Sequence, residues 1–301
     1  MSYMLTFQEL REGSLSFLVP VLSVISELNV YVLPIVIAMV YWAYRKDWGI
    51  NMFFSFTMSN FTANGIKSVM KVPRPYFRRP ALHIDPFIET SATGYSFPSG
   101  HATAATAGWG HFAMLLRKRW FTIVAIIYIL LSSFARVFLG AHTIQDVVCG
   151  ISQTILVILL VDTVSEYLTR HPDKYMLFAI LLVIISTAVT FIIAGMYPEI
   201  AADAEADSMI SDVFSSYGMI LGVNIGWIAD KKWIKMPDAS NKKERIIRCV
   251  IGGIAFAVYY LFLSNLIISS MDIRLGAFIR NFTTLLLVTI ILPCIFKRIH
   301  K

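Results

Sequence analysis

The chain has 301 residues, of which 57% are hydrophobic and only 15% carry a charge. Soluble globular proteins are about half apolar and about a quarter charged, so this composition excludes both a water-facing surface and intrinsic disorder. Three cysteines leave one unpaired, which excludes a disulfide scaffold. The composition therefore predicts an integral membrane protein. Its net charge of +7 is explained by basic residues that gather at the cytoplasmic membrane surface, without nucleic acid as a partner.

Residues 5–27 are apolar but interrupted by charged residues, a glycine and a proline. They predict an amphipathic helix that lies at the membrane interface, with an additional span as the alternative. Nine later stretches approach the roughly 20 apolar residues that a helix needs to cross a bilayer. They are 29–45, 49–69, 100–116, 119–138, 146–168, 175–197, 213–230, 246–268 and 275–296. We expect an all-α, polytopic membrane helix bundle of about nine transmembrane helices, which forms a single integral membrane domain over residues 1–301.

The distribution of basic residues predicts the orientation of these spans. Nine spans put the termini on opposite sides, and a carboxyl terminus inside places 17 of the 26 Lys and Arg residues on the inner side. The connection 198–212 then lies outside with five acidic residues and no basic one. This arrangement satisfies the positive-inside rule. We expect a multi-pass protein of the cell membrane with its amino terminus outside and its carboxyl terminus in the cytoplasm.

A first cluster of functional candidates lies at the end of the second predicted span. Lys67 is followed seven positions later by Arg74, which stands between Pro73 and Pro75. The prolines stop the helix, so the chain leaves the membrane there with two cationic side chains converging. Two basic residues snorkelling from a helix end are the simpler alternative.

A second cluster opens the third predicted span, in the sequence Phe97-Pro98-Ser99-Gly100-His101. Ser99 is a favourable N-cap, and Gly100 allows the backbone to approach a ligand closely. Free N–H groups at a helix amino terminus bind anions. His101 is then expected in the first turn, facing that anion.

A third cluster, Arg136, His142 and Asp146, precedes the fifth predicted span. His142 and Asp146 are four positions apart, one turn of a helix, so the carboxylate can hold one ring nitrogen and present the other. Ionisable groups at a membrane boundary are costly and usually functional, although an ordinary surface ion pair is the alternative. In the predicted topology all three clusters fall on the outer face, where they form a phosphate-binding site with a nucleophile and an acid.

The order and spacing of these clusters resemble the three-part signature of the type 2 phosphatidic acid phosphatase superfamily, over about residues 49–168. The resemblance implies a catalytic core over 49–168, with further transmembrane helices of unknown role over 213–296. The sequence departs from the family pattern at Ala135, where the family usually has serine, so one phosphate contact is missing. The nine-span layout is similar to that of the glucose-6-phosphatase branch.

The residues themselves allow a phosphoryl-transfer mechanism. We expect Lys67, Arg74 and Arg136 to compensate the phosphate charge, with directional hydrogen bonds from Ser99 and the amides near Gly100 and His101. His142 is the candidate nucleophile, held by Asp146, and His101 is the candidate general acid, roles that agree with those in the family. The clusters contain one carboxylate, too few for a Mg²⁺ or Ca²⁺ site, so we expect no metal and no cofactor.

The leading hypothesis is a hydrolase for a lipid phosphate or pyrophosphate, acting on the outer face through a phosphohistidine. The alternatives are a phosphatase for a soluble ester such as a sugar phosphate, a lipid phosphotransferase, and a transporter or lipid-binding scaffold. The sequence disfavours a binding protein, because phosphate binding alone does not require two histidines and an aspartate. The substrate itself and the oligomeric state stay open at this stage.

Overall fold

The computed structural model describes residues 1–197 and 204–300, and every regular element within these ranges is helical. The all-α prediction is therefore confirmed for the described part of the chain. The α-helices are α1 (Ser2–Glu12), α2 (Val19–Tyr31), α3 (Leu33–Met39), α4 (Lys46–Met70), α5 (Pro75–Arg78), α6 (Gly100–Ala105), α7 (His111–Leu116), α8 (Arg119–Phe138), α9 (Ile144–Arg170), α10 (Tyr175–Gly195), α11 (Ala204–Ala229), α12 (Lys242–Val258), α13 (Ser264–Ser270), α14 (Ile273–Leu286) and α15 (Leu292–Ile299). Single π-helical turns, Thr106–Gly110 among them, join several of these helices end to end.

The amino-terminal region differs from the single interface helix predicted over 5–27. The helical segments Ser2–Glu12 and Ser16–Tyr31 meet at an angle of 89°, because the first helix ends at Glu12 and a turn that includes Gly13 and Ser14 follows. Arg11 is buried rather than exposed to solvent, and its guanidinium donates to the carbonyl oxygen of Phe138 at 2.8 Å. The helix α1 is thus attached to the end of α8, and the predicted start of the first span at residue 29 falls inside α2.

Helices occur in each of the nine predicted spans, but five combine the length and the hydropathy expected of a membrane span, or six if the bent amino-terminal pair counts as one. These five are Arg119–Phe138, Ile144–Arg170, Pro172–Gly195, Lys242–Leu266 and Ile273–Ile299. The helix α4 is less apolar because it packs against α6, α9, α10 and α11 and presents polar groups to them. Asn51, for example, donates to Ser165 Oγ at 3.0 Å. Nine spans therefore stay a prediction, while an integral membrane protein of five or six such helices is what the described residues support.

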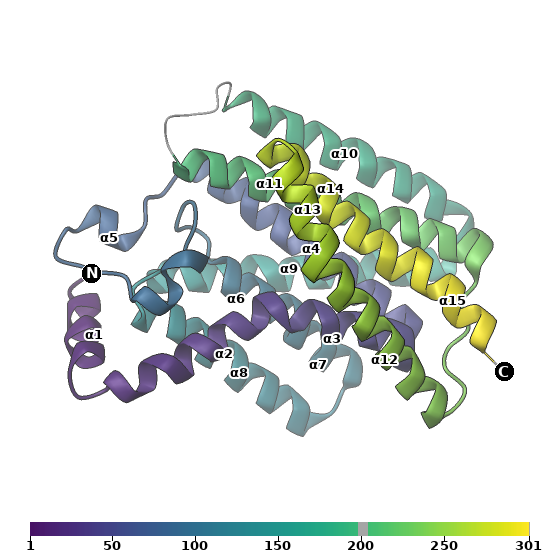
Figure 1. Cartoon of the computed structure of the whole chain (residues 1–301), viewed down its shortest axis with the longest axis horizontal. Coiled ribbons are helices and arrows are strands. Elements are labelled where there is room, and N and C mark those ends of the chain that lie inside the picture. Colours follow the sequence, from purple (N-terminus) through teal and green to yellow (C-terminus); the bar gives the residue numbers. More distant parts are fainter. Residues whose placement is uncertain (198–203, 301) are drawn as a thin grey trace.

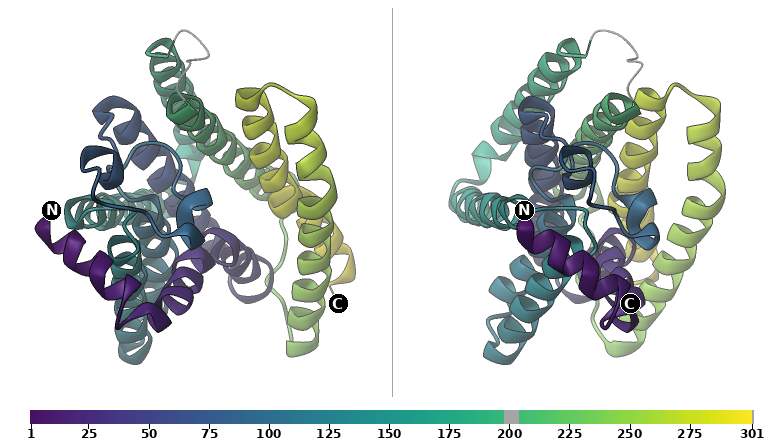
Figure 2. Two further views of the ribbon diagram at one scale, coloured as in Figure 1. Left: turned by 60° about the vertical axis from the view of Figure 1, so that its left-hand side comes forward. Right: turned by 90° about the vertical axis from the view of Figure 1, so that its left-hand side faces the viewer.

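The bundle has two layers joined by α4 and α11. Figure 2 shows the carboxyl-terminal helices α12 to α15 along one side of the molecule, and α14 packs against α11 over its length. The amino terminus, α5 and the connection 70–99 lie at one end of the bundle, and the carboxyl terminus lies at the other (Figure 1). The acidic connection predicted over 198–212 lies partly outside the described residues, and its remainder belongs to α11, which begins at Ala204.

Candidate active site

The first cluster sits where α4 ends. The helix stops at Met70, with Lys71 in the left-handed conformation at φ 48°, three residues before the first proline. Lys67 in the last turn is buried at 5% exposure, and its Nζ donates to the carbonyl oxygen of Tyr95 at 2.9 Å. The predicted convergence of cations is therefore found, but Lys67 turns into the protein rather than snorkelling outward.

Arg74 is held by main-chain oxygens on two sides. Its Nε donates to Gly94 O at 2.9 Å and its Nη2 to Thr93 O at 2.5 Å, while Nη1 donates to Ala141 O at 3.1 Å. Gly94 has a φ of +64°, and a Cβ there would lie 2.5 Å from Met209 Sδ in α11. Only glycine fits this position. The loop that binds the guanidinium of Arg74 therefore packs directly against α11.

The second cluster forms the helix start that its sequence predicts. Ser99 is the N-cap of α6 and accepts from the backbone N–H of Ala102 at 3.5 Å. The backbone N–H of Ser99 donates to Asp146 O at 2.9 Å, which ties this cluster to the third one. Gly150 allows this contact, because a Cβ there would lie 2.7 Å from Ser99 O. Apart from the chain neighbours of Gly100 and its own helix, no described residue has an atom within 4 Å of the Cβ position there, so the backbone beside His101 is open to a ligand.

The third cluster differs from its prediction in how the carboxylate is used. Thr143 is the N-cap of α9 and forms a capping box with Asp146, so His142 precedes the helix instead of lying one turn away on it. Asp146 Oδ2 accepts from Thr143 N at 2.7 Å and from Ser96 Oγ at 2.6 Å, but lies 3.7 Å from His142 Nδ1. Ser96 Oγ lies 3.4 Å from the same Nδ1. Asp146 therefore faces His142 with Ser96 beside it, and its short hydrogen bonds stabilise the helix start.

His142 is suited to act as a nucleophile. The side chain is 1% exposed, and burial lowers the pKa of the imidazole well below its usual value. The charges of Arg74 and Lys67 act in the same direction, and the contact with Asp146 opposes them. The ring is thus neutral, with Nδ1 toward the carboxylate and Nε2 lying 3.4 Å from Arg74 Nη1. An anion bonded at Nε2 would meet this guanidinium directly.

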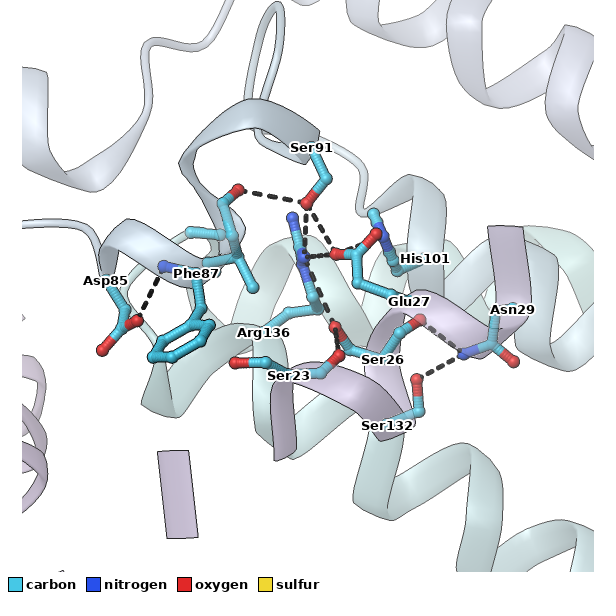
Figure 3. A network of polar contacts seen from close by, with 12 residues as sticks. Ser23, Ser26, Glu27, Asn29, Asp85, Phe87, Ser91, His101, Ser132 and Arg136 are labelled. Carbon is cyan, nitrogen blue, oxygen red and sulfur yellow. Dashed lines mark hydrogen bonds and ion pairs between the residues drawn. The ribbon is translucent and has the colours of Figure 1, made fainter. Parts of the chain in front are cut away.

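Arg136 and His101 meet a residue that the sequence analysis did not select, Glu27 of α2. Figure 3 shows its carboxylate between the two side chains, with Ser91 above it. Glu27 Oε1 accepts from Arg136 Nη1 at 2.9 Å and from Ser91 Oγ at 2.6 Å, and it lies 3.5 Å from His101 Nε2. Arg136 Nη1 also donates to Ser91 Oγ at 3.1 Å and to Ser26 Oγ at 3.4 Å.

The structure brings all the predicted site residues to one end of the bundle and buries almost all of them. Exposure is below 9% for Lys67, Arg74, Ser99, His101, Arg136, His142 and Asp146. Two further residues, Ser96 and Glu27, belong to the same polar network. A signal for Glu27 existed, because it is the only charged residue between positions 14 and 44. Ser96 carried no comparable signal, since a serine in a loop of this composition is unremarkable.

A large cavity lies away from this site. Its volume is about 800 Å³, and it lies near the other end of α4, bordered by Lys46, Phe54, Trp227 and Lys235 among others. A smaller cavity of about 260 Å³ does border the site, with Tyr3, Phe97, Thr143 and Asp146 in its wall. The 800 Å³ cavity borders none of the buried histidines and cations, so the chemistry belongs to the end of the bundle that holds them.

The described residues form an all-helical membrane protein with two buried histidines, three buried cations and a helix amino terminus at one end, an arrangement suited to binding phosphate. Comparison with known families specifies it further. Residues 48–170 match the PAP2 superfamily, and residues 214–301 match the transmembrane extension of PAP2 superfamily phosphatases. The chain belongs to the PAP2 superfamily, and the resemblance to type 2 phosphatidic acid phosphatases is confirmed.

Two curated relatives are similar to parts of the chain. Undecaprenyl-diphosphatase of Sulfolobus acidocaldarius is 34% identical over 103 residues, which are 34% of this chain and 48% of the relative. Phosphatidylglycerophosphatase B of Bacillus subtilis is 29% identical over 141 residues, which are 44% of this chain and 65% of the relative. The chain thus spans between about half and two thirds of the length of these relatives. No solved structure matches it significantly.

Proposed function

We propose that the protein is a metal-independent membrane phosphatase that hydrolyses a lipid phosphate or pyrophosphate through a phosphohistidine at His142. The observation that carries this proposal is the buried His142, whose Nε2 lies 3.4 Å from Arg74 Nη1 and whose Nδ1 faces Asp146. A nucleophile, its orienting carboxylate and a cation for the phosphoryl oxygens are the parts that this chemistry needs. The proposed catalytic core is 49–168, with 213–296 as additional helices.

In the first step His142 Nε2 attacks phosphorus, and the bond from phosphorus to the ester oxygen breaks. The electron pair leaves with that oxygen, which takes a proton from His101. Lys67, Arg74 and Arg136 compensate the charge on the equatorial oxygens, and Ser99 with the amides at Gly100 and His101 donates directional hydrogen bonds. Hydrogen bonds to charged groups contribute about 1.5–3 kcal/mol each.

In the second step water attacks the phosphohistidine and His101 accepts its proton. The bond between phosphorus and Nε2 then breaks, which returns the electron pair to the imidazole and releases inorganic phosphate. His101 is protonated again and His142 is neutral again, so the cycle closes. A phosphotransferase would differ only in the acceptor, an alcohol in place of water.

A lipid is the substrate class that the surroundings of the site favour. Both relatives carry names of enzymes that act on lipid phosphates or pyrophosphates. The connection 70–99 contains prolines and phenylalanines but no Asn or Gln, the amide side chains that often bind sugar hydroxyls. In the proposed topology the site sits at headgroup depth, so a lipid can present its phosphate there while its chains remain in the bilayer.

Phosphate release by the purified protein tests the proposal. We expect release from phosphatidate, phosphatidylglycerol phosphate or undecaprenyl pyrophosphate in mixed micelles, at rates that excess EDTA leaves unchanged. Glucose 6-phosphate serves as the soluble comparison. A kcat/KM for glucose 6-phosphate equal to or above that of every lipid would contradict a lipid substrate, and loss of activity in EDTA that Mg²⁺ restores would contradict the metal-independent mechanism.

The proposed orientation places the amino terminus and the site outside, with the carboxyl terminus in the cytoplasm. Support comes from the 17 of 26 basic residues on the expected inner side. We expect a membrane-impermeant maleimide to label Glu89→Cys in intact cells and to leave Lys242→Cys unlabelled until the membrane is opened. Both positions are exposed, and the test uses a variant without Cys149, Cys249 and Cys294. The reverse labelling pattern would put the site on the cytoplasmic side.

A further inference from the structure

A second carboxylate reaches the site from outside the segment that matches the PAP2 superfamily. Glu27 belongs to α2, whereas the matched segment begins at residue 48. Its side chain is 21% exposed, and Oε1 binds Arg136 Nη1 at 2.9 Å and lies 3.5 Å from His101 Nε2. The contacts bridge 109 positions of the sequence for Arg136, so the packing of α2 against α6 and α8 is what creates them.

The two histidines of the site are thus supported in parallel ways. His142 Nδ1 faces Asp146 Oδ2 at 3.7 Å, and His101 Nε2 faces Glu27 Oε1 at 3.5 Å. A carboxylate on one ring nitrogen orients the imidazole and favours its protonated form. His142 must be neutral to attack phosphorus, and the positive charges of Arg74 and Lys67 favour its neutral form. His101 must instead carry a proton before the leaving group departs, which calls for a nearby negative charge.

The charged groups that act on His101 are few. Burial is the largest effect and disfavours an imidazolium, as do Arg136 from α8 and Arg74 from the segment before α5, whereas Glu27 from α2 favours it. The short helix that carries His101 adds the positive end of its backbone amides. Glu27 is the carboxylate that counteracts burial and the two arginines at His101.

The guanidinium of Arg136 has one nitrogen bound by the protein and two without a partner among the described residues. Glu27, Ser91 and Ser26 all bind its Nη1. Its Nε and Nη2 are buried and have no hydrogen-bond partner among residues 1–197 and 204–300. Buried guanidinium nitrogens without a partner are costly, and these two form the edge that suits bidentate binding of a phosphoryl group.

From this geometry we propose that Glu27 is a positioning residue, which favours the protonated form of His101 as the general acid and turns the free edge of Arg136 toward the substrate phosphate. This inference rests on the proposed phosphatase function. It assigns a catalytic contribution to the amino-terminal helices, through a carboxylate that acts on His101 and Arg136 without touching the phosphate.

Dependence on the leaving group separates this role from simple structural support. An alkyl phosphate needs the general acid, whereas p-nitrophenyl phosphate has a leaving group that departs without a proton. General acid catalysis contributes about 10²–10⁴-fold in rate, so we expect Glu27→Gln to lower kcat for a dialkylglycerol phosphate by about 10²-fold. For p-nitrophenyl phosphate we expect a loss at least about tenfold smaller, which reflects the loosened Arg136.

The pH–rate profile and a second variant complete the test. In Glu27→Gln the alkaline fall of kcat for the alkyl substrate should begin at lower pH than in the wild type, because His101 loses its proton more easily. Glu27→Asp keeps the carboxylate and should recover part of the alkyl activity. The matched control is Glu89→Gln, an exposed carboxylate in the connection 70–99, which should behave as the wild type.

The outcomes distinguish this inference from the proposed function. If the wild type releases phosphate from neither substrate, the proposed function fails. If the wild type is active but Glu27→Gln loses the same factor on both substrates with an unshifted pH profile, Glu27 is only structural and the inference is wrong. A gain of activity with a lower KM would also overturn it, since Glu27 would then compete with the phosphate for Arg136.

Discussion

Replacing His142 with alanine should abolish turnover and with it the covalent phosphoenzyme. The variant lacks Nε2, the atom that lies 3.4 Å from Arg74 Nη1 and that attacks phosphorus in the proposed mechanism. Removing the nucleophile of an enzyme typically costs on the order of 10⁶ in kcat. The measurement is incorporation of ³²P from a labelled lipid phosphate, quenched in alkali because a phosphorus–nitrogen bond hydrolyses in acid. The wild type should retain label, and the variant should retain none.

His171 offers the matched control for this experiment. His171 directly follows α9 at the carboxyl end, whereas His142 lies just before the amino end of the same helix. The side chain of His171 is exposed and stacks on Tyr167. His171→Ala should therefore retain full activity and full label. Asp146→Asn should lose less than His142→Ala, because the carboxylate orients and stabilises rather than attacks. Label retained equally by the wild type and His142→Ala would mean that another residue is the nucleophile.

The second large effect is expected at Arg74. Its Nη1 lies 3.4 Å from His142 Nε2, and in the proposed mechanism its charge compensates the phosphoryl oxygens. Loss of one preorganised charge at such a position costs about 10²–10³ in kcat, so Arg74→Ala should lose that factor in kcat/KM for every lipid substrate. Arg74→Lys should recover part of it, because lysine restores the charge but cannot keep three nitrogens on Gly94, Thr93 and Ala141.

Arg119→Ala is the comparison for these variants, since Arg119 is exposed at the opposite end of α8 from Arg136. It should leave kcat/KM unchanged. The melting temperature of each variant in detergent distinguishes lost chemistry from a loosened 93–95 loop. Arg74→Ala with wild-type kcat/KM would remove this residue from the phosphate site.

Local sequence patterns predicted much of this protein correctly. Long apolar runs predicted an all-helical membrane protein, because burial in lipid requires helices with internally satisfied backbone groups. The stop of α4 at Met70 and the N-cap at Ser99 also follow from neighbouring residues alone. The three clusters identified the family for the same reason, since each cluster is a short stretch whose spacing is visible in the sequence.

Boundaries and span counts were less predictable. The break after Glu12 turns the expected interface helix into two helical segments at 89°, and Arg11 bonds to Phe138, a partner that the local sequence does not reveal. The helix α4 is too polar to satisfy a hydropathy criterion because neighbouring helices, not lipid, surround it. The hydropathy of a helix predicts whether it can face lipid on all sides. A central helix faces other helices instead, so its polar residues do not exclude it from the bundle.

What the sequence by itself determined was the helical class, the family and the identity of the charged and histidine side chains at the site. Only the tertiary structure decided how these side chains are paired. Asp146 makes its short bonds to Ser96 and Thr143 rather than to His142, and Glu27 reaches Arg136 across 109 positions. The physical reason is that a local pattern depends on neighbours in the chain, whereas a buried charge selects its partner among all the groups that helix packing brings within a few ångströms.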